Sequence, residues 1–331
     1  MKTEEQMESN KYKKIFWVML VLANAAAIGL IIFLGATRRD FSLNQQKNAR
    51  LIGESYMTMN NEFYEIISEA LNAQVEAKGD RVILRNPALS AERQIEQIEE
   101  MLEEDIDVLV ITPVDWTSLS EVLKKAKAQG VYIVVVDTNV SDEELADCTI
   151  TSDNYKAGSI AGEYFLSQCR EAKLIIMTHE ATKSGQERVQ GFIDTISTRE
   201  SIEIVRKIEC EGQAEIAMPK LQEAIDEGVV FDNVFCLNDP TGVGVVAALD
   251  DNGILERVDV YGVDAYPDAK ALIYADMMKA TVAQFPTELG NMAAEVIYKL
   301  LDGEEVEKKI MMPVELVTKE NVEEFGVDKW Q

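Results

Sequence analysis

The feature that most constrains the fold of this chain is a long alternation of short apolar segments with longer amphipathic ones. The apolar segments at the start of the pattern are residues 51–56, 81–85, 107–111 and 132–136, with helical patterns at 90–104 and 117–129. A strand followed by a helix and then by another strand forms a parallel pair with the helix covering one face. The pattern therefore predicts a doubly wound parallel α/β sheet.

The alternation starts again after residues 148–151, so the chain contains two similar α/β units in tandem. Further strands are predicted at 173–177, 202–208, 233–237, 257–262 and 280–284, followed by a helix at 287–302 and a final extended segment at 311–317. Two such units make a cleft between two lobes plausible. Glu54 does not fit the pattern, because a central parallel strand is expected to be apolar on both faces.

An apolar run of 22 residues without a charge, residues 15–36, precedes the alternation and is long enough to span a bilayer. We interpret it as an uncleaved transmembrane anchor between a cytoplasmic tail, residues 1–14, and a linker, residues 37–49. A cleavable signal peptide is the alternative, because Ala23-Asn24-Ala25 fits the small-x-small cleavage pattern. Cleavage there would leave an apolar mature terminus, which favours the anchor.

The charge and the scarce metal-binding residues exclude two classes of function. Residues 1–50 carry eight Lys and Arg against four Asp and Glu, whereas residues 51–331 carry 24 against 55. So acidic a body repels phosphate backbones, and nucleic-acid binding is not expected. The four cysteines form no C-x-x-C pair, and His179 is the only histidine. The sequence therefore predicts no metal site and no cofactor. His179 follows the predicted strand 173–177 and could approach the cleft, but it is interpreted as a solvated loop residue.

Polar side chains follow the predicted strands at their carboxyl ends, where open α/β sheets bind ligands. They are Asn61, Asp137, Asn238, Asp264 and Gln284, joined by Arg188 on the opening turn of a helix. Carboxylates accept hydrogen bonds from adjacent hydroxyls, amides donate and accept, and Arg donates in a fixed fork. Phe63 and Tyr64 offer flat surfaces to the C–H faces of a ring. Each residue alone is typical of a turn or cap, but the set predicts a site for a neutral polyol.

With these residues in place, the chain resembles the ribose- and galactose-type periplasmic sugar-binding proteins over residues 50–318. The matching motifs are Met59-Asn60-Asn61-Glu62-Phe63-Tyr64, Ile111-Thr112-Pro113-Val114-Asp115, Val136-Asp137, Thr151-Ser152-Asp153-Asn154, Gln186-Glu187-Arg188-Val189-Gln190-Gly191-Phe192, Leu237-Asn238-Asp239, Gly262-Val263-Asp264 and Ala283-Gln284-Phe285-Pro286. The resemblance implies two doubly wound parallel-sheet lobes joined by three crossovers, near residues 153, 285 and 315. It assigns residues 50–152 and 285–314 to the first lobe, and 153–284 and 315–331 to the second.

The resemblance also implies which residues line the cleft and where this chain departs from the family. The implied ligand-binding residues are Asn61, Phe63, Tyr64, Asp137, Arg188, Asn238, Asp264 and Gln284. Thr138, counted as a ninth ligand-binding residue, stands where ribose-type members carry an Arg, and Glu211-Gly212-Gln213-Ala214 replaces a loop with an aromatic residue. Ribose itself is therefore not expected, and another pentose, a hexose, a cyclitol or a sugar-like ligand stays open. Trp116 is either a wall near the cleft or a surface residue at the start of a helix.

Together these observations predict a single-pass protein of the cell membrane with an extracytoplasmic, non-enzymatic body that closes on a sugar by hinge bending. Its expected partner is an ABC-type importer permease or a sensor histidine kinase. Two alternatives stay open. One is an enzyme acting on sugars with Asp137 and Asp264 as general acid and base. The other is a regulator-type ligand-binding domain, which the absence of an N-terminal helix-turn-helix disfavours.

Overall fold

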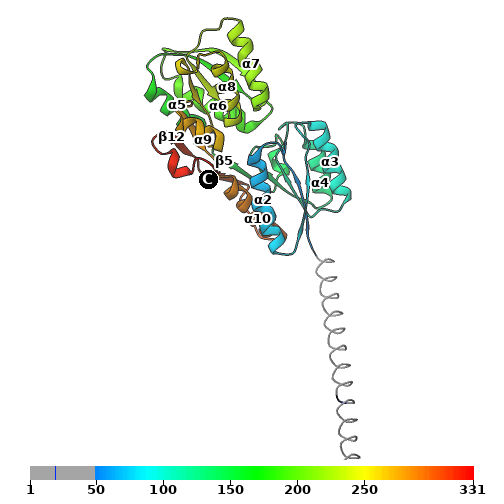
Figure 1. Cartoon of the computed structure of the whole chain (residues 1–331). Coiled ribbons are helices and arrows are strands. Elements are labelled where there is room, and N and C mark those ends of the chain that lie inside the picture. The colour runs from blue at the N-terminus through cyan, green and yellow to red at the C-terminus, as the bar shows by residue number, and fades with distance from the viewer. Residues whose placement is uncertain (1–18, 20–48) are drawn as a thin grey trace, which may run out of the picture. The chain divides into compact units, whose positions relative to one another are not determined.

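The computed structural model describes residue 19 and residues 49–331 of the chain (Figure 1). Residues 50–331 form one compact unit. Within the described part of the chain, no helix is both long and apolar enough to cross a membrane. The predicted tail, anchor and linker lie outside the described residues, except for Met19 and Ala49.

The first lobe is built on a six-stranded parallel sheet in the order β11-β5-β4-β3-β1-β2. Its strands are β1 (Leu51–Ser55), β2 (Arg81–Arg85), β3 (Val108–Ile111), β4 (Tyr132–Val136), β5 (Cys148–Ser152) and β11 (Lys309–Met312). Its helices are α2 (Glu62–Ala77), α3 (Ala91–Glu103), α4 (Ser120–Ala128) and α10 (Pro286–Leu301), with a 3₁₀ turn at Glu143–Leu145. Alternate residues of β3 and β4 join two separate apolar clusters, one under α2 and α10 and the other under α3 and α4 (Figure 1). Both faces are thus covered, as the continuous apolar strands predict.

The second lobe repeats this plan in a six-stranded sheet of order β12-β10-β9-β8-β6-β7. Its strands are β6 (Ala172–Thr178), β7 (Ile202–Glu209), β8 (Asn233–Cys236), β9 (Asp259–Tyr261), β10 (Ala280–Ala283) and β12 (Glu315–Thr318). Its helices are α5 (Asn154–Gln168), α6 (Lys183–Ile196), α7 (Ala214–Asp226), α8 (Asp239–Asp251) and α9 (Pro267–Tyr274), with 3₁₀ turns at Leu255–Arg257 and Val322–Phe325.

Two details of this topology differ from the sequence prediction. The sheet of the second lobe is not wholly parallel, because β12 pairs with β10 in the antiparallel direction. The single extended segment predicted at 311–317 is two strands, β11 and β12, which join different sheets. Pro313 lies between them and has no N–H to donate to a ladder, so the strand ends there and the chain passes to the other lobe.

The chain passes between the two sheets three times. It leaves the first sheet after β5, returns between β10 and α10, and leaves again between β11 and β12. Three adjacent connections leave the lobes joined along one side, which is the geometry of a hinge.

Glu54, the residue that did not fit the strand pattern, is completely buried in β1. Its Oε2 accepts a hydrogen bond of 2.6 Å from the Ser68 hydroxyl on α2, which in turn accepts one from Asn72. Burial raises the pKa of Glu54 to about 7. Its other oxygen has no partner within the described residues. The strand therefore carries a carboxyl group that prefers to keep its proton.

Candidate functional site

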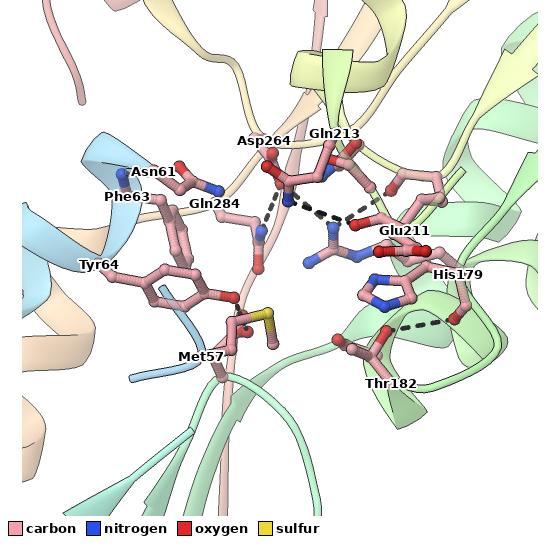
Figure 2. A pocket seen from close by; sticks show the side chains of 16 residues that line it. Met57, Asn61, Phe63, Tyr64, His179, Thr182, Glu211, Gln213, Asp264 and Gln284 are labelled. Atoms are coloured by element: carbon pink, nitrogen blue, oxygen red, sulfur yellow. Dashed lines mark hydrogen bonds and ion pairs between the residues drawn. The ribbon is translucent and has the colours of Figure 1, made fainter. Parts of the chain in front are cut away.

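A cavity lies between the two sheets, at the carboxyl ends of their strands, with about 420 Å³ of space not filled by protein atoms, the open solvent at its mouth included. It is lined by Met57, Asn61, Phe63, Tyr64, Asp137, His179, Thr182, Ser184, Arg188, Glu211, Gly212, Gln213, Leu237, Asn238, Asp264 and Gln284. Figure 2 shows Met57, Asn61, Phe63 and Tyr64 on one side and His179, Thr182 and Glu211 on the other. Both lobes thus contribute to one site.

The first lobe places an amide and two aromatic rings at the start of α2. Asn61 is the N-cap of this helix, and its Oδ1 accepts a hydrogen bond of 3.0 Å from the Phe63 N–H. The cap fixes the side chain and leaves its Nδ2 as a donor. Phe63 and Tyr64 are buried and pack edge to face, with ring centroids 5.5 Å apart. The start of α2 therefore supplies a rigid aromatic wall.

Asp137 directly follows β4 and is only 4% exposed. Its backbone has a φ of +74°, an unusual conformation for a residue other than glycine. Its Oδ2 accepts a hydrogen bond of 3.2 Å from the Tyr64 hydroxyl. Burial raises the pKa of Asp137, and the positive charge of Arg188 opposes the rise.

Arg188 faces Asp137 from the second lobe and is held on three sides. Its Nε donates to Asn154 Oδ1 at 2.8 Å, and its Nη1 donates to the Leu237 carbonyl and to Asp264 Oδ1, both at 3.2 Å. It is 5% exposed. These bonds leave Nη2 as a donor that no described residue uses, so the guanidinium is oriented before any ligand arrives.

Two glycines fix the position of the helix that carries Arg188. A Cβ on Gly158 of α5 would lie 1.9 Å from the Arg188 carbonyl oxygen, and one on Gly191 of α6 would lie 2.1 Å from the Tyr155 carbonyl oxygen. Neither contact is possible for a real side chain. The two helices therefore pack backbone against backbone, which sets the depth at which Arg188 enters the cavity.

Asp264 and Gln284 complete the floor of the cavity. Gln284 Nε2 donates to Asp264 Oδ1 at 2.7 Å, while Gln284 Oε1 is buried and has no partner within the described residues. Behind them Asp239 is fully buried and accepts from Thr281 Oγ1 and from the Tyr266 N–H. Burial raises the pKa of Asp264, and burial together with the charge of Asp264 raises the pKa of Asp239. The floor thus has more acceptors than donors.

Of the nine residues proposed from sequence, the structure brings eight together around this cavity: Asn61, Phe63, Tyr64, Asp137, Arg188, Asn238, Asp264 and Gln284. Thr138 is the exception, because it is buried outside the lining and its Oγ1 accepts a hydrogen bond of 3.0 Å from the Ser184 N–H of the other lobe. The physical reason is the bend at Asp137, where the Thr138 N–H bonds back to the Val136 carbonyl. Neighbouring side chains therefore serve different partners.

Sequence reasoning missed several lining residues, of which His179 and Glu211 carry chemistry. His179 was expected in solvent, yet it is 8% exposed and lines the cavity. Burial lowers its pKa, against the charges of Glu209 and Glu211. His179 directly follows β6, so the strand-end rule that found Asn61 and Asp137 also applied to it. The loop after β7 brings Glu211 and Gly212, whose φ is +66°. Its close approach to His179 and Asn238 leaves little room for a side chain.

The lobes also touch each other beside the cavity, in a set of contacts that we call the clasp: Trp116, Thr138, Ala181, Lys183 and Ser184. The Trp116 N–H donates to the Ala181 carbonyl at 3.1 Å, and the Lys183 ammonium lies 5.6 Å from the Trp116 ring centroid. The bond between Thr138 and Ser184 belongs to the same contact. Trp116 is therefore a contact between lobes and not a wall of the cavity. The structure shows the lobes closed.

The C-terminal residues brace the site from outside, a role that the sequence did not indicate. The Trp330 ring centroid lies 5.6 Å from that of Phe63 and 5.5 Å from that of Tyr266, and its Nε1 donates to Glu62 at 2.9 Å. Gln331 Nε2 donates to the backbone carbonyls of Asp264, at 2.8 Å, and of Gln284. The tail thus contacts both lobes and two residues of the cavity floor.

Comparison with known proteins decides the family. The family model described as a periplasmic binding protein domain matches residues 52–305. The chain belongs to this family. Periplasmic binding protein domains bind ligands and are not enzymes, as the sequence predicts. The resemblance drawn from the motifs is thereby confirmed at the level of the family and of the fold.

Named relatives of this periplasmic binding protein domain are similar along most of their length. The ribose import binding protein of Bacillus subtilis is 25% identical over 269 residues, which cover 81% of this chain and 87% of that protein. The D-xylose-binding periplasmic protein of Escherichia coli is 28% identical over 242 residues, which cover 70% of this chain and 72% of that protein. An ABC transporter solute binding protein from Bacillus halodurans, solved with bound myo-inositol, matches with a TM-score of 0.79 at 24% identity. The match covers 85% of this chain and 98% of the Bacillus halodurans chain.

Proposed function

We propose that this protein is an extracytoplasmic receptor that closes its two lobes on a small sugar or sugar-like polyol, and that residues 15–36 tether it to the membrane. The observation that carries the proposal is the cavity between the lobes, where donors, acceptors and aromatic rings from both sheets face one space. Closure around a ligand held on several sides is the way hinged binding proteins select and release small molecules.

The groups left without protein partners match the chemistry of adjacent hydroxyls. Arg188 Nη2 and Asn61 Nδ2 are oriented donors, while Asp137 Oδ1 and Gln284 Oε1 are acceptors. Each ligand hydroxyl donates once and accepts from a second group. The rings of Phe63 and Tyr64 offer apolar faces to the carbon skeleton. The ligand is therefore held both by its polar edge and by its apolar face.

The arrangement supports binding over hydrolysis. Asp264 already accepts from Arg188 and Gln284, and Asp137 accepts from Tyr64. Carboxyl groups occupied in this way act as fixed acceptors, whereas a glycosidase needs one to release a proton and the other to attack or activate water. Turnover of a glycoside by the pure protein would contradict this part of the proposal.

We propose an ABC-type importer permease as the partner, because the relatives include an import binding protein and an ABC transporter solute binding protein. A sensor histidine kinase is the second candidate. The proposed tether, the 22 charge-free residues 15–36, favours it because a tethered receptor stays beside one membrane partner. Ligand-biased closure of the same hinge serves either partner. Labelling an introduced surface cysteine at Glu304 in intact cells tests the sidedness of the body.

A thermal-shift experiment tests the binding site. The full chain, in a detergent without a sugar headgroup, is heated with ribose, xylose, galactose, glucose, myo-inositol or an amino derivative of one of these, and unfolding is followed by intrinsic fluorescence. A ligand at a hundredfold excess over its Kd stabilises the folded state by about 2.7 kcal/mol, which corresponds to a shift of about 5 °C. If no sugar, cyclitol or amino derivative moves the midpoint, the receptor proposal is wrong.

The clasp gives a second prediction, because Thr138 contacts the other lobe without touching the cavity. In the Thr138→Val variant the Ser184 N–H loses its acceptor in the closed form only. We expect Kd to rise roughly 3- to 10-fold, the worth of one hydrogen bond, mainly through faster release. The measurement is calorimetry on any sugar found in the screen. Thr198→Val, an exposed change at the end of α6, is the control, and equal affinities in the two variants would show that the clasp does not stabilise the closed form.

A further inference from the structure

The cavity has an excess of negative charge. Its lining includes three carboxylates, Asp137, Glu211 and Asp264, and a single guanidinium, that of Arg188. His179 adds no second cation, because burial lowers its pKa. Two of the three carboxylates, Asp137 and Asp264, are at least nine-tenths buried, so water does not compensate their charges.

The one guanidinium is committed mainly to one of these carboxylates. Arg188 forms an ion pair with Asp264 at 3.2 Å, and its Nε donates a hydrogen bond to Asn154 Oδ1. Asp137 forms no ion pair within 4.0 Å in the part of the chain that the structure describes. Its one side-chain hydrogen bond comes from the neutral Tyr64 hydroxyl, and its Oδ1 has no partner among those residues. A buried carboxylate held this way is incompletely compensated.

The floor of the cavity adds a hydrogen-bond acceptor, the amide oxygen of Gln284, whose orientation is fixed. Gln284 directs its Nε2 at Asp264, an orientation that the carboxylate imposes, so its Oε1 is the atom left without a partner. The cavity thus needs more hydrogen-bond donors than it offers. A hydroxyl brings one donor and no charge, whereas an ammonium group brings three donors and a positive charge.

From this imbalance we infer that the ligand is a sugar or cyclitol that carries a protonated primary amine, with the ammonium group held by Asp137. The inference rests on the proposed function and narrows its ligand class. The other hydroxyls of the ligand meet Arg188 and Asn61, and the ring lies against Phe63 and Tyr64. Glu211 lies on the opposite wall beside His179 and adds a longer-range attraction for a cation (Figure 2).

Matched pairs of probes test the inference on the full chain by titration calorimetry. The pairs are glucose with glucosamine, galactose with galactosamine, mannose with mannosamine, and inositol with its monoamine. The N-acetyl form of each amino sugar keeps the nitrogen without the charge. We expect at least one amine to bind tenfold or more tightly than its hydroxyl parent, and its N-acetyl form to lose that advantage.

The Asp137→Asn variant locates the charge effect. It keeps the volume of the side chain and an oxygen to accept from Tyr64, but removes the negative charge. The ratio of affinities for amine and parent should fall close to one, whereas Asp194→Asn, an exposed change on α6, should leave the ratio unaltered. Because the readout is a ratio within one variant, a change in overall stability does not obscure it.

The possible outcomes separate the two proposals. If neutral sugars bind as tightly as their amines, or if Asp137→Asn keeps the preference for the amine, the inference is overturned while the receptor proposal stands. If no probe of either class binds, both fail. A preference for the amine that disappears with Asp137→Asn supports both.

Discussion

Replacing Arg188 with alanine should weaken binding of any neutral sugar that the cavity accepts by at least 100-fold. Among the residues that the structure describes, the guanidinium is the one cation between Asp137 and Asp264, and the change would leave two buried carboxylates facing each other. Removing one member of a buried ion pair costs about 3–5 kcal/mol, which corresponds to a factor of roughly 10² to 4 × 10³ in affinity. Titration calorimetry with a neutral sugar that binds the wild type measures the loss directly.

Two further variants show whether this loss belongs to the site. Arg206→Ala removes a partly exposed Arg of the same lobe that pairs with Glu227, and it should bind as the wild type does. Arg188→Lys restores one charge but not the fork that reaches Asn154, Leu237 and Asp264 together, so a partial recovery is expected. Unchanged affinity in Arg188→Ala would place the ligand outside the cavity.

The periodicity of the sequence predicted the sheets because it reports a property of single segments. A strand buried on both faces must be apolar along its length, as at 132–136, and the polar residue that follows marks its end. Parallel strands end at the same edge, so residues as distant as Asn61 and Gln284 were expected together without any contact information. Each of these steps uses local pattern and a general rule of topology.

What the sequence did not indicate depends on local backbone geometry or on tertiary contacts. Thr138 was assigned to the ligand because it occupies the position at which ribose-type members carry an Arg. The positive φ of Asp137 turns the chain, so that Thr138 instead contacts Ser184 in the clasp. The tail at Trp330 and Gln331 has no periodicity, and its role follows from Lys270. This buried side chain donates to the Phe325 carbonyl and to Gln331, so it ties the end of the chain to α9.

The Glu54→Gln substitution should remove a fall in stability that accompanies rising pH. In the folded protein the pKa of Glu54 is about 7, whereas that of a solvent-exposed glutamate is 4.5. Between these values the folded state binds more protons than the unfolded state, so the free energy of unfolding decreases as pH rises through the window. The contribution reaches roughly 3 kcal/mol, about 1.4 kcal/mol for each pKa unit.

Urea unfolding of the wild type and of Glu54→Gln at pH 5 and at pH 8 measures this contribution as a difference of differences. Carboxyl groups common to both proteins, including Asp239 and Asp264, titrate in each and cancel, so the remaining pH dependence belongs to Glu54. The free energy of unfolding of the variant minus that of the wild type should be larger at pH 8 than at pH 5. Glutamine can accept a hydrogen bond from Ser68 and has no charge that must be desolvated. Glu69→Gln, an exposed change on α2, should show no such difference. If Glu54→Gln instead tracks the wild type at both pH values, Glu54 is ionised inside the sheet, and a group that supplies the compensating charge must lie beside β1.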